Sequence, residues 1–183
     1  MELSADNDAV VRGPNVHLRT LRPSDANPTY LSWLHDPLVT QYLETRHQKH
    51  TAESLDAFVT EHLTPGVERL FAICLNEDDR HIGNIKLGPI DWRNFTAETG
   101  LLIGDRNCWG RGLATEAIAL MCRYAFEGLR LRRIHAGVYA ANHGSLRAFE
   151  KCGFVREGLL RGAVLYENEP MDVVLLGRFA SDP

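Results

Sequence analysis

The stretch Ile103-Gly104-Asp105-Arg106-Asn107-Cys108-Trp109-Gly110-Arg111-Gly112-Leu113-Ala114-Thr115-Glu116-Ala117 decides the fold. It joins a strand-like segment to a helix with an apolar stripe through a glycine-rich turn. The first turn of a helix carries unpaired N–H groups and the positive end of the helix dipole, and glycine lets a backbone approach an anion closely. The stretch therefore predicts a phosphate cradle. Its backbone would come from Gly110, Gly112, Leu113, Ala114 and Thr115, with Arg111 as a neighbouring cation.

Two other nucleotide-binding motifs are excluded by spacing. A Walker A loop needs four residues between its glycines and then Gly-Lys-Ser/Thr, which this turn lacks. A Rossmann fingerprint needs a third glycine inside an early βαβ unit. An ordinary strand–helix connection remains the structural alternative to a phosphate cradle.

Outward from the turn, the hydrophobic pattern alternates between strand-like and helical segments. Strands are predicted at 16–21, 70–75, 81–90, 96–103, 134–140, 154–166 and 171–179, and helices at 24–43, 51–63, 113–128 and 145–152. We expect one mixed α/β domain over residues 14–183, with an antiparallel meander before the turn. Residues 1–13 are predicted to form a flexible N-terminal segment.

Composition narrows the function classes. The chain has 183 residues, of which 44% are hydrophobic, and a formal net charge of -4. This balance argues against non-specific nucleic-acid binding. No apolar run approaches the ~20 residues of a membrane span, and the N-terminus does not resemble a signal peptide. The four cysteines show no metal-binding spacing. We expect a soluble cytoplasmic protein without a metal.

Two motifs carry a family resemblance. Residues Trp109 to Ala117 resemble motif A of the GNAT acetyltransferases, closest to the branch of the ribosomal-protein alanine N-acetyltransferases. Asn142-His143-Gly144-Ser145-Leu146-Arg147-Ala148-Phe149-Glu150-Lys151-Cys152-Gly153-Phe154 resembles the Asn-x-x-Ser … Glu-Lys-x-Gly-Phe segment of the family. The resemblance covers about residues 16–179. It implies the GNAT fold, a mostly antiparallel twisted sheet that is splayed at the acetyl-CoA site and flanked by helices.

The resemblance also implies a set of cofactor-binding residues. The donor would be acetyl-CoA, with its pyrophosphate on the amides of the glycine-rich turn. Backbone N–H groups near Leu102 and Ile103 would polarise the thioester carbonyl. Asn142 would contact the cofactor arm, or else act as a turn residue. The general pattern of the family has Gln or Arg where this chain has Trp109, a departure that the branch shares.

The catalytic residues are less constrained by the sequence. Ser145 is the candidate acid for the departing thiolate, or else the cap of its helix. Phe149 stands where many family members carry a tyrosine acid. Glu98 is the candidate base because some members place an acid on this strand, and a solvated strand residue is the alternative. His135 and Tyr139 alternate onto one face of their strand, and either could relay a proton if that face lines the cleft.

The resemblance implies an N-acetyltransferase that transfers the acetyl group directly to a primary amine. A protein N-terminal amine is suggested by the closest branch. A nucleotide-linked amino sugar, a polyamine or an aminoglycoside stays open, as does a non-catalytic acetyl-CoA-binding module. Five residues are candidates for the acceptor site: Tyr30, Trp33, Tyr42, Glu44 and Arg46. Because the family often dimerises, a homodimer is also expected.

Overall fold

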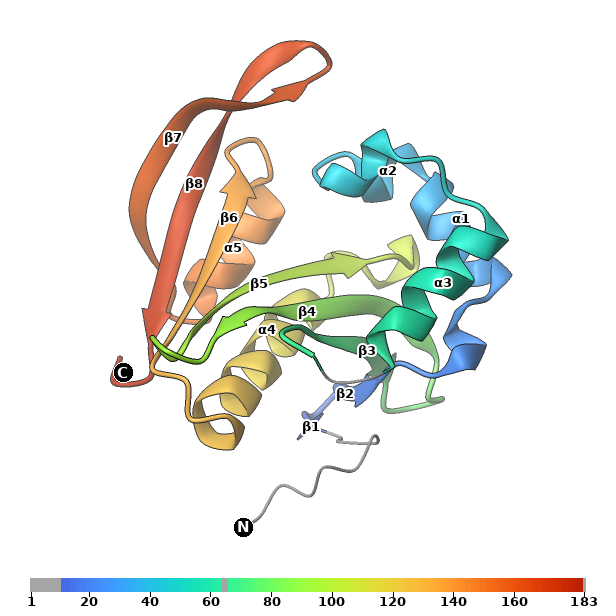
Figure 1. Ribbon diagram of the computed structural model, residues 1–183, viewed down its shortest axis with the longest axis horizontal. Coiled ribbons are helices and arrows are strands. Elements are labelled where there is room, and N and C mark those ends of the chain that lie inside the picture. The colour runs from blue at the N-terminus through green and yellow to red at the C-terminus, as the bar shows by residue number, and fades with distance from the viewer. Residues whose placement is uncertain (1–10, 64–65, 183) are drawn as a thin grey trace.

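The computed structural model describes residues 11–63 and 66–182, and its centre is a mixed eight-stranded sheet (Figure 1). The strands follow the order β1-β2-β3-β4-β5-β6-β8-β7. Their bounds are β1 (Val11–Arg12), β2 (Val16–Thr20), β3 (Arg69–Leu75), β4 (His81–Asp91), β5 (Thr96–Ile103), β6 (Arg133–Tyr139), β7 (Val155–Tyr166) and β8 (Glu169–Phe179). Neighbours are antiparallel except β5 and β6, which are parallel. The predicted mixed α/β class with a mostly antiparallel sheet is confirmed.

The parallel pair β5–β6 is short, and this shapes the site. Only Thr96–Glu98 of β5 pairs with β6, although β5 continues to Ile103. Beyond this point β6 pairs only with β8 on its other side. The second half of β5 and the second half of β6 therefore diverge, as Figure 1 shows, and leave backbone groups of β5 without a strand partner.

Helices cover both faces of the sheet (Figure 1). One face carries α4 (Leu113–Arg123), which continues into a single π-helical turn (Tyr124–Gly128), and α5 (His143–Lys151). The other face carries α1 (Pro28–His35), α2 (Pro37–Thr40) and α3 (Ala52–His62). Three 3-10 turns complete the described elements: η1 (Pro23–Asp25), η2 (Glu44–His47) and η3 (Arg106–Cys108).

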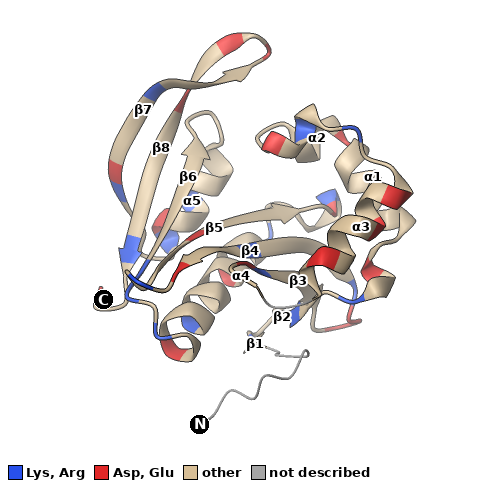
Figure 2. Cartoon of the chain, in the orientation of Figure 1, with Lys and Arg blue, Asp and Glu red and all other residues tan. Residues whose placement is uncertain are grey.

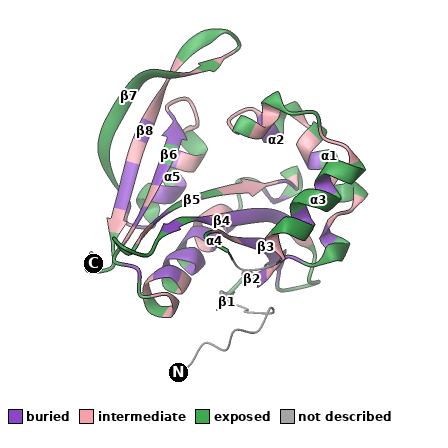
Figure 3. Cartoon of the chain, in the orientation of Figure 1, coloured by how far each residue is buried: buried purple, intermediate pink, exposed green. Residues whose placement is uncertain are grey.

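Strand β3 separates two apolar cores. Phe71 and Ile73 face the core under α4 and α5, whereas Leu70 and Ala72 face the core under α1 and α3. This alternation is the two-residue period of a strand that is buried on both faces. The buried residues in Figure 3 accordingly follow the central strands, and exposed residues follow β7 at the sheet edge.

The described part of the chain begins with a short strand. Val11 and Arg12, which fall inside the segment predicted to be flexible, form β1 and pair with β2. The division into residues 1–13 and 14–183 stays a prediction. The carboxylate of Glu116 accepts N–H groups of Asn15 and Val16 at 2.8 and 2.9 Å. This ties the entry of the chain to α4. Residues 1–10 lie outside the described residues.

Charged residues of both signs are spread over the described surface. In Figure 2 acidic and basic residues are interspersed in the layer of α1–α3 and along the β7–β8 hairpin. Among the described residues, no helix is both long and apolar enough to cross a membrane.

Candidate active site

The turn before α4 has a backbone shape that requires its glycines. Gly110 and Gly112 have φ values of 73° and 79°, a conformation that residues with a Cβ rarely adopt. Gly112 is also the N-cap of α4. A Cβ on either glycine would meet no other atom within 4 Å. The space beside the turn is therefore open, and backbone conformation alone explains the need for glycine.

The N–H groups of this turn are unpaired. From Gly110 to Thr115, no backbone N–H donates a hydrogen bond to another described residue, and the helical ladder begins with Glu116, which donates to the Gly112 carbonyl at 3.1 Å. These donors are consecutive and lie at the positive end of the helix dipole. Such an arrangement binds phosphate groups.

Three side chains of the turn anchor it to neighbouring segments. The Trp109 indole donates to the Ile103 carbonyl at 2.8 Å. Asp105 forms an ion pair with Arg80, and Arg106 forms one with Asp36 at 3.3 Å. These contacts hold the turn against the end of β5 without using its free N–H groups.

The end of β5 directs backbone donors into the diverging region. Gly104 donates to the Ile82 carbonyl at 2.8 Å. Because successive residues of an antiparallel strand direct their N–H and C=O groups to opposite sides, those of Leu102 face β4 and those of Ile103 face away from it. Ile103 is therefore the better carbonyl-polarising donor of the two predicted residues.

Helix α5 is capped by Asn142. Its Oδ1 accepts the backbone N–H of Ser145 at 3.0 Å, which is the usual N-cap contact. The alternative role considered for Ser145, capping the helix, is thus filled by Asn142. Within residues 11–63 and 66–182, the Ser145 hydroxyl has no hydrogen-bond partner.

A cleft of about 580 Å³ joins these elements. It is bounded by the starts of α4 and α5, the end of β5, and α2 with the residues that follow it. Nine of the predicted cofactor-binding and catalytic residues line it: Leu102, Ile103, Gly110, Gly112, Leu113, Ala114, Thr115, Asn142 and Ser145. Arg111 does not line the cleft. Its Nη1 lies 4.0 Å from the Cys108 sulfur, and the residue is exposed.

Two basic residues in the cleft were not predicted. Arg147 and Lys151 line it from α5, and neither forms an ion pair with a described residue. They are four residues apart and so lie on one helix face. That spacing, on the same face as Gly144 and Ala148, is the sequence signal that could have identified them.

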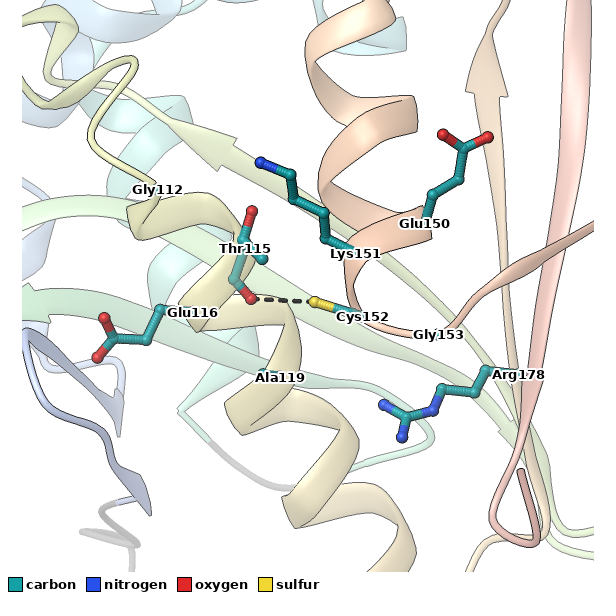
Figure 4. A pocket seen from close by; sticks show the side chains of 9 residues that line it. All are labelled: Gly112, Thr115, Glu116, Ala119, Glu150, Lys151, Cys152, Gly153 and Arg178. Atoms are coloured by element: carbon teal, nitrogen blue, oxygen red, sulfur yellow. Dashed lines mark hydrogen bonds between the residues drawn. The ribbon is translucent and has the colours of Figure 1, made fainter. Parts of the chain in front are cut away.

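Lys151 also borders a second groove of about 650 Å³ between α4 and α5 (Figure 4). The groove runs from Gly112 to Arg178 of β8. Across it the Cys152 thiol donates to the Thr115 carbonyl at 3.1 Å. This contact joins the first turn of α4 to the end of α5.

Glu98 is separated from the other predicted site residues. It is exposed and pairs with His135 where β5 and β6 are still joined, and it does not line the cleft. Five strand residues span about 17 Å, which separates Glu98 from the donor at Ile103. Burial lowers the pKa of the neighbouring His135.

The acceptor-site candidates fall into two groups. Tyr30 and Trp33 are buried in the core under α1 and α3, so their helical spacing reflects packing. Tyr42 lines the cleft. Glu44 and Arg46 lie beyond Tyr42 and contact the Tyr139 hydroxyl at the end of β6.

The structure brings together one group of possible metal ligands that the spacing of cysteines in the sequence did not indicate. His17, Cys74 and Asp79 bring possible metal-ligand atoms within 4.8 Å of one another, because His17 pairs with Cys74 across β2 and β3. The His17 ring contacts Asp79 and Asn76, each at 2.9 Å. Burial raises the pKa of the Cys74 thiol to about 11, which disfavours the thiolate that a metal needs. The absence of a metal stays a prediction.

The fold and the site together define an α/β acyltransferase. The acetyltransferase (GNAT) domain model matches residues 15–155, and the chain belongs to this family of N-acetyltransferases. It is 32% identical over 160 residues to the uncharacterized N-acetyltransferase p20 of Bacillus licheniformis, covering 86% of this chain and 89% of that protein. It is 30% identical over 110 residues to the spermidine N(1)-acetyltransferase of Vibrio cholerae, covering 59% of this chain and 61% of that protein.

Solved structures show the same fold. A GNAT-family acetyltransferase from Bacillus anthracis superposes with a TM-score of 0.83 at 22% identity, covering 95% of this chain and all of that one. The Vibrio cholerae spermidine N-acetyltransferase, solved with CoA and spermine, gives 0.81 at 23% identity, covering 91% and 96%.

Proposed function

We propose that the protein transfers the acetyl group of acetyl-CoA directly to a primary amine. The observation that carries this proposal is the run of N–H groups from Gly110 to Thr115 at the cleft, which have no partner among the residues the structure describes. A diphosphate suits these donors because each oxygen accepts several hydrogen bonds. Backbone groups make the contacts, so Trp109 at the neighbouring position does not weaken them.

The rest of the cleft fits the remaining parts of acetyl-CoA. The open space beside Gly110 and Gly112 leaves room for the pyrophosphate. Arg147 and Lys151 supply positive charge for phosphate groups. The pantetheine arm would lie along the end of β5, where unpaired backbone groups can bond its amides. The relative solved with CoA has the same fold.

The residues of the chain then have distinct tasks. Positioning of the two substrates is the main contribution, since well-oriented reactants gain about 7–11 kcal/mol. The Ile103 N–H donates to the thioester carbonyl oxygen, and such a donor contributes about 2.7–4 kcal/mol in acyl transfer. The Ser145 hydroxyl donates a proton to the departing sulfur. A thiol pKa of ~8.5 means that a weak acid is sufficient.

Glu98 is left out of this proposal. Its place on the paired half of β5 puts it outside the cleft. Asn142 keeps a role in cofactor binding, because its Oδ1 caps α5 while its amide N–H groups bond to none of the described residues. Arg111 is retained only as a nearby cation.

Small cationic amines are the acceptors we place first. The spermidine N(1)-acetyltransferase of Vibrio cholerae is a partial relative of this chain. Glu44 presents an exposed carboxylate close to the cleft-lining Tyr42, and a carboxylate attracts ammonium groups. A protein N-terminal amine and a nucleotide-linked amino sugar are the second and third acceptor classes.

The test is release of free CoA thiol from acetyl-CoA. Spermidine, an alanine-starting peptide and an amino-sugar nucleotide would be offered in parallel, and mass spectrometry would identify the acetylated product. We expect transfer to spermidine above the rate without amine. Acetyl-CoA binding without transfer to any amine would favour a non-catalytic module. The homodimer and the cytoplasmic location stay predictions.

A further inference from the structure

A hydrogen-bonded pair links the end of β6 to the turn η2. Tyr139, the last residue of β6, donates its hydroxyl proton to Glu44 Oε1 from 95 residues away in the chain. Tyr139 is 7% exposed, whereas the Glu44 side chain is 71% exposed. The pair therefore connects a buried phenol to solvent.

Arg46 fixes the orientation of the phenol. Its Nη1 donates to the Tyr139 oxygen at 2.9 Å and to the Leu43 carbonyl at 2.8 Å, and its Nη2 donates to the Leu165 carbonyl at 2.9 Å. The guanidinium carbon also lies 5.1 Å from the Tyr139 ring centroid. Arg46 thus holds Tyr139 in place by bonds within the protein. The phenol oxygen keeps room for a second donor.

The pair stands next to the cleft, behind Tyr42, and neither Tyr139 nor Glu44 lines the cleft itself. Tyr42 lines the cleft, and its ring centroid lies 6.1 Å from that of Tyr139 and 5.6 Å from that of Tyr166. In Figure 1 the segment after α2 faces the β7–β8 hairpin across the end of β6. This is the side of the cleft opposite the phosphate cradle, where the acceptor must enter because the cradle end would be filled by the cofactor.

We infer that Tyr139 and Glu44 form the proton relay for the acceptor amine. The inference rests on the proposed function. An ammonium N–H proton passes to the Tyr139 oxygen while the original phenol proton passes to the Glu44 carboxylate. The ammonium N–H bond and the original Tyr139 O–H bond break, and a new O–H bond forms on Tyr139 and on the Glu44 carboxylate. The charges of the ammonium and of Glu44 disappear together, and the exposed Glu44 returns its proton to water.

The electrostatics agree with this role. Burial and the hydrogen bond to Glu44 raise the pKa of Tyr139, against the opposing effect of Arg46. The phenol is therefore protonated and neutral at neutral pH. It can accept a proton from the amine only as it gives its own proton to Glu44. Among the described residues, the titratable groups recorded in contact with the pair are Arg46 of η2 and Tyr42, and Tyr42 in turn contacts Tyr166 of β7.

The relay fits an acceptor that arrives as a small ammonium ion. The faces of tyrosine rings and an exposed carboxylate both attract cations. A free amine of this kind has a pKa near ~10, so it must lose a proton before it can attack a thioester at neutral pH.

The test compares Tyr139→Phe and Glu44→Gln with the parent over pH 6.5 to 9.5, with spermidine as the acceptor. Glu44→Gln keeps an acceptor for the Tyr139 hydroxyl but cannot take the proton. We expect both variants to lose about 100-fold in kcat at pH 7. The loss should shrink as pH rises, by up to about tenfold per pH unit, because more of the amine is already neutral. Acetyl-CoA affinity, measured by calorimetry, should not change.

Matched controls are Tyr124→Phe, a tyrosine packed on Phe71 in the core, and Glu61→Gln on the exposed face of α3. Both should keep the kcat of the parent. A Glu44→Gln variant with parental kcat at pH 7, or a loss in both relay variants that is the same at every pH, would overturn the relay alone. A parent that binds acetyl-CoA but acetylates no amine would overturn the proposed function as well.

Discussion

Asn142 caps helix α5 by accepting the backbone N–H of Ser145 at 3.0 Å. The sequence offered two roles for Ser145, helix cap and proton donor, and the structure gives the first of them to Asn142. The side chain of Asn142 stabilises the helix start, and the hydroxyl of Ser145 faces the cleft without a partner in the described part of the protein. The two tasks can be tested independently.

Replacing Ser145 by alanine should lower turnover without changing the fold. The backbone N–H that Asn142 accepts is retained, so the melting temperature should match that of the parent. Loss of the proton donor should lower kcat by about 10- to 100-fold, with the acetyl-CoA Kd unchanged. As a contrast, Asn142→Ala should cost about 1 kcal/mol of stability. Equal kcat in Ser145→Ala and the parent would remove Ser145 from the mechanism.

Removing the cations of α5 should weaken acetyl-CoA binding. Arg147→Ala and Lys151→Ala each delete a charge that lines the cleft, and a charge-assisted hydrogen bond contributes about 1.5–3 kcal/mol. We expect roughly a tenfold or larger rise in the Kd for each, and a weaker dependence of binding on salt. Calorimetry at two salt concentrations measures both. Arg161→Ala, an exposed arginine of β7, is the control, and an equal effect there would contradict the assignment.

A buried ion pair under the helical layer should make stability depend on pH. Arg19 donates to both carboxylate oxygens of Asp25 at 2.7 and 2.8 Å, and the Arg22 N–H adds a third bond at 2.7 Å. Burial raises the pKa of Asp25, but these hydrogen bonds outweigh it and lower the pKa below its ordinary value. Because the pKa is lower in the folded state, the pair stabilises the protein at neutral pH, and that stability is lost as pH falls below about 4.

Asp25→Asn should therefore lower the free energy of unfolding by about 3–5 kcal/mol at pH 7. The difference from the parent should narrow as pH falls below about 4, because the unfolded parent chain then takes up a proton on Asp25 that the folded state resists. Urea unfolding at both pH values measures this. Asp56→Asn, on the exposed side of α3, should change little at either pH. A difference between Asp25→Asn and the parent that is independent of pH would show that charge on Asp25 does not matter.

The sequence predicted those parts of the site that depend on local backbone. The strand 96–103 agrees with β5 in both bounds, and the glycine-rich turn follows from glycine spacing and the amphipathic helix after it. Both features are set by neighbours in the chain. The same holds for the start of α5, where only the roles of Asn142 and Ser145 had to be divided.

Features that join distant segments could not be predicted. The contact of Glu44 with Tyr139 spans 95 residues and depends on how η2 meets the end of β6. The position of Glu98 outside the cleft depends on where β5 and β6 part. Tyr30 and Trp33 follow helical spacing, which is the same for a core face and a ligand face. Sequence pattern alone does not distinguish these cases.

The central claim is that the turn from Gly110 to Thr115 holds the pyrophosphate of acetyl-CoA. Its most direct test is calorimetric titration of the parent and of Gly112→Asp with acetyl-CoA, with Gly100→Ala, a β5 glycine with open space around it, as the control. The account predicts one site per chain in the parent and in the control, and no measurable binding in Gly112→Asp, which retains a folded melting transition. Binding of equal affinity in Gly112→Asp and the parent would contradict it.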